Sequence, residues 1–297
     1  MEEIQIIGAP FDVINHHSSN SNLYPESFRW TLAEKSIKVF SDNAIFLPIM
    51  HDIPKEEGTF RFGWICESNS VVPELISKMK DSYEVILDHC EYDAIFTCDR
   101  SLCELDPRIK FSCAGSNLPW TPKGEQKIYE KIKLCSMIAS PKGEGPNASP
   151  GHAFRVSWAE KLRDKLDLYG GVFGTRRIGF SSDLNKVWHN KAEALYDYMF
   201  SVIIENGKYD DYYTEKITDA FATGTVPIYY GSPSIVEKFN PEGIIMLDEN
   251  FNIDDLSADL YHSKMEAIKD NFDRVQNHVG SDDILYQNIT ANLGVFK

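Results

Sequence analysis

The stretch that decides the fold reads IIENGKYDDYYTEKITDAFATGTVPIYYGSP and covers residues 203–233. It joins a short apolar run, a polar loop, a short amphipathic segment and a second apolar run that ends in Gly-Ser-Pro. Short apolar runs bounded by turn residues are typical of buried strands, and strands that alternate with helices build parallel sheets. The stretch therefore predicts a strand–helix–strand unit of a parallel α/β sheet.

The helix of this unit is expected over residues 214–224, and its first turn is unusual. Thr214 can cap the helix by accepting hydrogen bonds from the first N–H groups, and Gly224 can end it. One buried face is formed by Ile217, Ala220 and Phe221. Lys216 lies in the first turn, where the helix already carries about half a positive charge, so this lysine is unfavourable for the helix alone.

An anion bound at this helix end would explain Lys216. A phosphate would interact with the N–H groups, the helix dipole and the ammonium together. Glu215 repels phosphate, but its carboxylate can accept hydrogen bonds from the vicinal hydroxyls of a ribose or a sugar. A nucleotide sugar carries both groups. The spacing alone also fits an ordinary capped helix with solvated charges.

The alternation of strands and helices runs through the rest of the chain. Strands are predicted at residues 4–11, 44–49, 60–66, 92–98, 132–140, 168–174, 199–204, 226–231 and 243–247. Helices are predicted at residues 72–90, 152–166, 191–198, 233–239 and over much of 251–279. Two Rossmann-like halves, residues 1–128 and 129–297, with a ligand in the cleft between their parallel sheets, are the economical α/β architecture.

Composition excludes several classes of protein. Apolar residues make up 42% of the 297 residues, which is enough for a sizeable core, and the net charge of −15 disfavours non-specific binding to nucleic acids or anionic membranes. No stretch approaches the roughly 18 apolar residues of a membrane span. The acidic N-terminus and six cysteines without a CxxC pair predict a cytoplasmic protein with reduced thiols. No Asp-x-Asp sequence occurs, so a divalent-metal clamp of two carboxylates is not expected. No cofactor is expected either.

Residues 196–247, YDYMFSVIIENGKYDDYYTEKITDAFATGTVPIYYGSPSIVEKFNPEGIIML, resemble the donor-binding signature of the α-1,3/4-fucosyltransferase family, glycosyltransferase family 10. That signature has a strand ending in Phe-Glu-Asn, a short loop, Tyr-x-Thr-Glu-Lys and a strand of the form Val-Pro-Ile that closes in Gly-Ser or Gly-Pro. Ile204 departs from the usual Phe, and Gly207 from the usual Ser or Thr.

The resemblance implies a GT-B architecture, GDP-fucose as the donor and a set of donor-site residues. These residues are Asn206, Tyr212, Glu215 and Lys216, with Lys216 on the pyrophosphate. Arg155, which opens a helix after a Pro- and Gly-rich loop, fits the family's phosphate-binding arginine; it also fits a surface arginine. The secondary candidates are Glu205, Arg176 and Arg177. The nearby His152 is interpreted as a capping residue.

Glu67 is the candidate catalytic base. The segment RFGWICESNS, residues 61–70, resembles the family segment that carries the catalytic glutamate after a strand. A carboxylate there could take the proton of the acceptor hydroxyl, a step that contributes about 10²- to 10⁴-fold to the rate. Glu67 also fits the N-terminus of the following helix. Residues 68–91 intervene before the next strand, where the family has a shorter connection.

The combined hypothesis is an inverting, metal-independent glycosyltransferase in which Glu67 is the base and Arg155 and Lys216 stabilise the departing GDP. The acceptor would be the hydroxyl of an oligosaccharide, a lipopolysaccharide or a glycoprotein glycan. Another nucleotide sugar as donor and a non-catalytic nucleotide- or glycan-binding protein stay open as alternatives. A glycoside hydrolase needs two opposed carboxylates, and Lys216 beside Glu215 argues against it.

Overall fold

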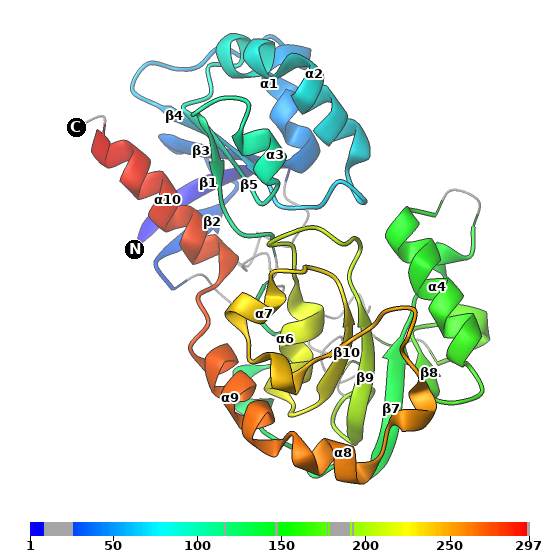
Figure 1. Cartoon of the computed structure of the whole chain (residues 1–297). Coiled ribbons are helices and arrows are strands. Elements are labelled where there is room, and N and C mark those ends of the chain that lie inside the picture. Colours follow the sequence, from blue (N-terminus) through cyan, green and yellow to red (C-terminus); the bar gives the residue numbers. More distant parts are fainter. Residues whose placement is uncertain are drawn as a thin grey trace. The chain divides into compact units, whose positions relative to one another are not determined.

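A computed structural model describes residues 1–8, 26–115, 117–145, 148–176, 178, 191 and 193–295, without the side chains of residues 43 and 295 (Figure 1). The chain forms two compact units. The first unit comprises Met1–Asn117, Tyr209–Tyr212 and Val279–Lys297, and the second comprises Leu118–Lys208 and Tyr213–His278. The first unit thus combines three separate parts of the chain. The division into functional domains at residue 128 stays a prediction.

The first unit is built on a parallel sheet with the strand order β2-β1-β3-β4-β5-β6. Its strands are β1 (Glu2–Ile7), β2 (Phe28–Thr31), β3 (Ile37–Ser41), β4 (Phe60–Ile65), β5 (Ala94–Thr97) and β6 (Ile109–Phe111). Its helices are η1 (Asp42–Phe46), α1 (Leu47–Met50), α2 (Pro73–His89), α3 (Arg100–Cys103) and α10 (Ser281–Val295).

Two apolar clusters cover the two faces of this sheet. Helix α10 contributes Leu285 and Ile289 to the cluster around Trp30 and Trp64. Helix α2 contributes to the other cluster, with Leu75 and Met79 among its buried residues. A parallel sheet covered by helices on both faces is the Rossmann-like arrangement that the sequence predicts.

The second unit has a parallel sheet with the strand order β11-β10-β9-β7-β8. Its strands are β7 (Lys133–Ile138), β8 (Asp167–Tyr169), β9 (Tyr198–Ile204), β10 (Val226–Tyr230) and β11 (Ile245–Met246). The α-helices are α4 (Pro150–Leu162), α6 (Glu215–Ala222), α7 (Ile235–Lys238), α8 (Ala258–Ser263) and α9 (Met265–Gln276). Short 3₁₀ turns are η2 (Lys123–Glu125), η3 (Pro141–Gly143), η4 (Val172–Gly174), η5 (Pro241–Gly243) and η6 (Ile253–Asp255).

The strand order of the second unit identifies where a ligand is expected. Along the chain, the sheet grows from β7 to β8 on one side and then from β9 to β11 on the other. Neighbouring strands β7 and β9 therefore form the switch point of a doubly wound sheet. Ligands of such sheets bind outside the carboxyl ends of the strands at this point.

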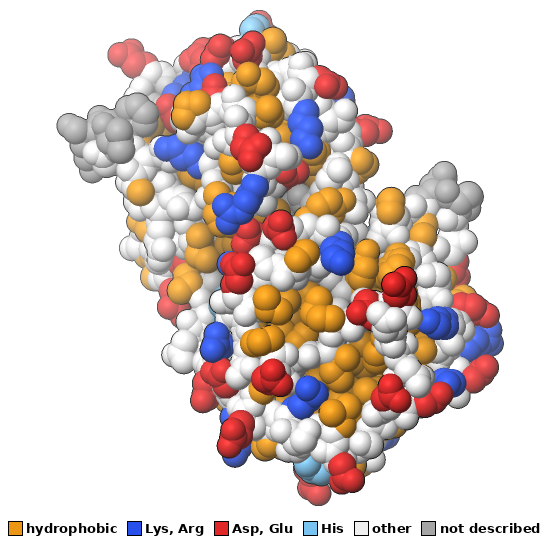
Figure 2. All heavy atoms as spheres, in the orientation of Figure 1, with side chains coloured by type: hydrophobic (Ala, Val, Ile, Leu, Met, Phe, Trp, Pro, Cys, Tyr) orange, Lys and Arg blue, Asp and Glu red, His pale blue; other side chains and the backbone are white. Residues whose placement is uncertain are grey.

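The predicted α/β class with two parallel, Rossmann-like sheets is confirmed; these are the components of the predicted GT-B architecture. The opening stretch contains the end of β9, α6 and β10 as predicted. Most other predicted strands and helices are also present, within a few residues of their expected ends. Acidic and basic side chains are interspersed on the face drawn in Figure 2.

Two element predictions were wrong, and three strands were missed. Residues 44–49, predicted as a strand, form η1 and α1, and Pro48 lies in the first turn of α1, where proline suits a helix. Of the helix predicted at 191–198, residues 193–197 form turns, and β9 starts at Tyr198. The Lys131 ammonium satisfies the carbonyl groups of Leu195 and Tyr196 there. The missed strands are β2, β3 and β6.

Candidate functional site

The first turn of α6 is held by a buried carboxylate at the end of β9. Thr214 caps the helix by accepting a hydrogen bond from the N–H of Lys216. Its own N–H and Oγ1 donate to the two carboxylate oxygens of Glu205, at 2.9 and 2.8 Å. The Glu205 side chain is fully buried. Glu205, a secondary donor-site candidate, thus fixes the start of α6.

Lys216 is surrounded by acceptors rather than by free solvent. Its Nζ donates to Thr214 Oγ1 at 2.9 Å and lies 3.4 Å from Glu205 Oε2 and 3.5 Å from Glu215 Oε1. These carboxylates offset the repulsion between the ammonium and the helix dipole. The side chain keeps 23% of its surface exposed, so the ammonium can still reach a ligand.

A second lysine, which sequence reasoning missed, holds Glu215 from the other side. Lys191 is buried, and its Nζ lies 3.2 Å from Glu215 Oε1 and 2.8 Å from Asp219 Oδ2. The same ammonium lies 4.3 Å from the centre of the Trp120 ring. Asp219 also accepts from the N–H and the hydroxyl of Thr121, at 2.7 and 2.9 Å.

Two neighbouring lysines keep the buried Glu215 ionised. Burial alone would raise its pKa, but Lys216 and Lys191 outweigh burial and lower the pKa to about 2. One feature of the sequence could have indicated a lysine such as Lys191. Asp219 lies four residues after Glu215 and therefore on the same side of the helix. Two buried carboxylates on one helix side require a cation nearby.

Arg155 reaches the same strand end from helix α4. Ser149 caps α4 by accepting from the N–H of His152. Nε and Nη2 of Arg155 donate to the carbonyl oxygen of Ile204 at 3.0 and 2.5 Å, and Nη2 also donates to Asn206 Oδ1 at 3.1 Å. Arg155 and Asn206, which are 51 residues apart in sequence, are thus brought together at the carboxyl end of β9.

These side chains line a pocket of about 600 Å³ at the switch point between β7 and β9. Four predicted site residues lie in its wall: Arg155, Asn206, Glu215 and Lys216. Further lining residues include Trp120, Lys142, His152, Lys191 and Asp219. The volume lies in the range of small-molecule sites.

The lowered pKa of His152 indicates a positively charged environment in this pocket. Burial, followed by repulsion from Arg155, Lys142 and Lys216, lowers the pKa of His152 to about 4. The interpretation of His152 as a capping residue is confirmed in part, because its Nδ1 lies 2.5 Å from Ser149 Oγ. Three cations around one imidazole make the pocket suited to an anion with several charges.

Tyr212 and Glu67 lie elsewhere, in the first unit. Tyr212 is 1% exposed, and its hydroxyl donates to Glu67 Oε2 at 3.1 Å. Glu67 follows strand β4, as predicted, and its backbone N–H donates to Asp42 Oδ1 at 3.3 Å. Tyr212 is not among the lining residues of the pocket in the second unit.

Of the remaining arginine candidates, Arg176 is not among the described residues that line the pocket. Arg176 is 68% exposed and forms an ion pair with Glu193 at 2.8 Å. Arg177 falls outside the described residues.

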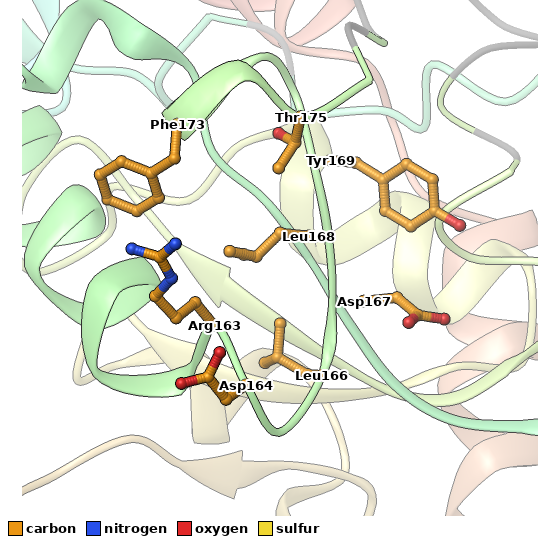
Figure 3. Close-up of a pocket in the computed structure, with 8 residues that line it drawn as sticks. All are labelled: Arg163, Asp164, Leu166, Asp167, Leu168, Tyr169, Phe173 and Thr175. Carbon is orange, nitrogen blue, oxygen red and sulfur yellow. The ribbon is translucent and has the colours of Figure 1, made fainter.

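The second unit has another, more open hollow of about 500 Å³ beside β8 (Figure 3). Arg163 and Phe173 point toward each other across it, and the guanidinium lies 5.5 Å from the ring centre. Its other lining residues are Asp164, Leu166, Asp167, Leu168, Tyr169 and Thr175. No predicted site residue lines it.

No group of three or more His, Cys, Asp or Glu side chains in the described part of the chain is arranged to hold a metal ion. No helix in the described ranges is long and apolar enough to cross a membrane.

A doubly wound sheet with cations at its switch point is an arrangement that many α/β proteins use to bind phosphorylated ligands. Residues 147–272 match the model of the C-terminal domain of glycosyltransferase family 10 (fucosyltransferase). This match confirms the resemblance to that family found in the sequence. The match includes every predicted residue of the pocket but not Glu67.

Individual proteins with similar sequences are consistent with this match. The chain is 34% identical over 172 residues to the α-(1,3)-fucosyltransferase FucT of Helicobacter pylori, a match that covers 56% of this chain and 33% of that enzyme. It is 49% identical over 43 residues to the GDP-fucose protein O-fucosyltransferase 3 of Bos taurus, covering 14% of this chain and 9% of that protein. The chain thus spans a third or less of these relatives.

A solved structure is also similar. The crystal structure of an α1,3-fucosyltransferase with GDP matches with a TM-score of 0.49 at 16% identity, over 98% of this chain and 90% of that chain.

Proposed function

We propose that this protein is an inverting glycosyltransferase that transfers fucose from GDP-fucose to a hydroxyl of a glycan. The pocket of the second unit would hold the donor, with Arg155 and Lys216 on the diphosphate and Asn206 and Glu215 on hydroxyl groups. The similarity to a fucosyltransferase and to a GDP-fucose protein O-fucosyltransferase supports fucose as the sugar and GDP as its carrier.

The observation that carries the proposal is the convergence of cations on one polar wall of the pocket. Arg155 comes from α4 and Lys216 from α6, and both lie beside the carboxyl end of β9. A diphosphate brings two or more negative charges, and each charge-assisted hydrogen bond to it is worth about 1.5–3 kcal/mol. The fully charged Glu215 beside them is an acceptor for hydroxyls, which the same ligand supplies.

In the proposed reaction, the oxygen of the acceptor hydroxyl attacks the anomeric carbon of fucose. The bond from that carbon to the diphosphate oxygen breaks, and the electron pair leaves with GDP. Glu67 takes the hydroxyl proton, and Arg155 and Lys216 stabilise the charge that grows on the diphosphate. One displacement at the anomeric carbon inverts its configuration. Groups of the protein alone carry these steps, and metal independence stays a prediction.

Calorimetric titration tests the donor. We expect GDP and GDP-fucose to bind at least about tenfold more tightly than UDP and UDP-glucose, a difference of 1.4 kcal/mol or more. Incubation with GDP-fucose and a panel of oligosaccharides, lipopolysaccharides and glycoproteins should then give a fucosylated product, detected by mass spectrometry.

Each alternative predicts a different result. Preference for UDP-sugars would replace GDP-fucose by another donor. Binding of GDP-fucose without a product from any acceptor, and without its hydrolysis, would favour a non-catalytic binding protein. Absence of binding by any nucleotide would overturn the proposal.

A further inference from the structure

Asp42, the first residue after strand β3, combines two locally unfavourable features. Its backbone has a φ of +39°, in the left-handed region that residues other than glycine rarely adopt, although aspartate is among the more tolerant of them. Its carboxylate is also buried, and burial raises the pKa of Asp42 because the charged form loses its hydration. A residue that breaks two local rules is expected where function requires it.

Three hydrogen bonds from the neighbouring strand end hold this carboxylate. Its Oδ1 accepts from the backbone N–H groups of Cys66 and Glu67, at 3.1 and 3.3 Å, and its Oδ2 accepts from the Cys66 thiol at 2.8 Å. Strands β3 and β4 are parallel neighbours, with Ser41 opposite Trp64 in the register, so their carboxyl ends lie side by side. Asp42 therefore fixes the chain at the point where it leaves β4.

Gly115, which follows strand β6, holds the same turn from the other side of β4 in the sheet. The N–H of Gly115 donates to the carbonyl oxygen of Cys66 at 3.0 Å. A Cβ added to Gly115 would lie 2.9 Å from the Cβ of Cys66, so the two segments are as close as glycine permits. The backbone directly before Glu67 is thus fixed from two sides.

A fixed backbone matters at this place because Glu67 is the proposed base. A catalytic base must be held within a fraction of an ångström of its working position, since small displacements cost large factors in rate. We infer that Asp42 is a positioning residue for this base, because it fixes the backbone from which the Glu67 side chain extends. The inference rests on the proposed function, in which Glu67 takes the proton of the acceptor hydroxyl.

Three substitutions of Asp42 separate its hydrogen bonds from its backbone conformation. Asp42→Asn keeps an oxygen for the two N–H groups, and asparagine tolerates a positive φ. Asp42→Gly suits the same φ but removes every acceptor of the side chain. Asp42→Ala removes the acceptors and also strains the backbone.

We expect kcat to fall about 10- to 100-fold in Asp42→Gly and Asp42→Ala, and to stay within about threefold of the unmodified protein in Asp42→Asn. The Kd for GDP, measured by calorimetry, should change less than about twofold in all three, because the residues proposed to hold the diphosphate belong to the second unit. The melting temperature should be lower in Asp42→Ala than in Asp42→Gly. A purely structural residue would change the melting temperature and leave the kcat of the folded protein unaltered.

Two controls connect the effect to Asp42 and to the base. Asp52→Gly is the matched control, since Asp52 is an exposed aspartate of the first unit that also has a positive φ, +48°. Its kcat should equal that of the unmodified protein. In a Glu67→Gln background, Asp42→Gly should lower kcat no further, because the group through which it acts is absent.

Three results would overturn the inference. The first is an unchanged kcat in Asp42→Gly. The second is an equal loss of kcat in Asp42→Asn, which would make the charge of Asp42 responsible rather than its hydrogen bonds to the backbone. The third is an undiminished effect of Asp42→Gly in the Glu67→Gln background, which would mean that Asp42 does not act through the base.

If Asp42→Gly and Asp42→Ala do not fold, Asp42→Ser decides. Its hydroxyl keeps the site polar, but its oxygen is one bond too short to reach both N–H groups. Lower kcat with unchanged GDP affinity supports the inference, and unchanged kcat overturns it.

Failure of the proposed function would look different. The unmodified protein would then neither bind GDP nor transfer fucose, or Glu67→Gln would be fully active, before any variant of Asp42 is compared.

Discussion

Two lysines that share one carboxylate oxygen have different environments. Lys216 and Lys191 both contact Glu215 Oε1, at 3.5 and 3.2 Å. Lys216 is partly exposed in the pocket wall, whereas Lys191 is buried and also holds Asp219. The first is placed to meet a ligand and the second to neutralise the protein's own charges. Their substitutions should therefore separate binding from stability.

Lys216→Ala should weaken GDP binding and leave the fold intact. Loss of one charge-assisted hydrogen bond to the diphosphate predicts about a 10- to 100-fold higher Kd in calorimetry. The change in melting temperature should be small, because Lys191 still pairs with Glu215. Lys269→Ala, at an exposed position of α9, is the control and should leave the Kd unchanged. An unaltered Kd in Lys216→Ala would sink the assignment of the phosphate site.

Lys191→Met should do the opposite and destabilise the second unit. The substitution leaves the buried carboxylates of Glu215 and Asp219 without their shared cation, and breaking a buried ion pair from one side costs about 3–5 kcal/mol. Urea unfolding measures this loss directly. A variant as stable as the unmodified protein would show that the two carboxylates do not depend on Lys191.

Helix α4 meets strand β9 at a glycine, and this contact determines where Arg155 lies. A Cβ added to Gly151 would lie 1.8 Å from the carbonyl oxygen of Asn206. The atoms nearest to this Cβ all belong to the backbone of Asn206, so no flexible side chain could move aside for it. Only glycine permits this close approach of the helix to the strand end.

Gly151→Ala should therefore displace the first turns of α4. We expect a loss of about 1–3 kcal/mol of stability, the usual cost of overpacking, together with weaker GDP binding because Arg155 shifts with the helix. Gly124→Ala is the matched control, since nothing lies within 4 Å of the position of its added Cβ. If Gly151→Ala bound GDP as tightly as the unmodified protein, the helix position would not matter to the site.

Local chemistry explains which elements could be predicted. The Thr214 cap and the terminal Gly224, whose φ is +71°, are encoded within a few residues of α6, and both were found in the sequence. The partners of this helix are not encoded locally. Lys191 meets Glu215 across 24 residues, and Tyr212 meets Glu67 across 145. Patterns of neighbouring residues carry no information on such pairs, so Lys191 was missed and the hydrogen bond between Tyr212 and Glu67 was not predicted.

At the scale of the whole molecule, acid should destabilise the protein through two histidines. Burial and nearby lysines and Arg155 lower the pKa of His152 to about 4, and burial followed by Lys238 lowers that of His278 to about 4. His278 Nε2 lies 2.9 Å from the Tyr213 hydroxyl. The folded chain keeps both rings neutral between pH 6.5 and 4, while the unfolded chain protonates them.

Because the unfolded state binds more protons in this range, the free energy of unfolding should fall as the pH drops from about 6.5 to about 4 and then lose no more from these groups. Each histidine contributes roughly 1–3 kcal/mol to this fall. Urea unfolding at pH 7, 5.5 and 4.5 measures it, and His278→Gln, which cannot titrate, should flatten the slope. An equal slope in His278→Gln would remove His278 from the explanation.

The division of the whole chain into units was the least predictable feature. A boundary near residue 128 follows from composition and from the apparent restart of the strand pattern, but the first unit also takes in the loop 209–212 and the last helix. Helix α10 lies beyond the last region that was predicted to be helical, residues 251–279. Its placement depends on pairs such as Trp30 Nε1 with Asp282 Oδ1, at 2.8 Å across 252 residues.

The position of α10 has a consequence for the order in which the protein folds during its synthesis. The ribosome makes the strands of the first unit before the second unit, yet Leu285 and Ile289, which cover one face of that sheet, are made only after the second unit. This apolar face of the sheet therefore stays uncovered while the second unit is translated. We therefore expect the dependence of the nascent chain on chaperones to be greatest until α10 emerges.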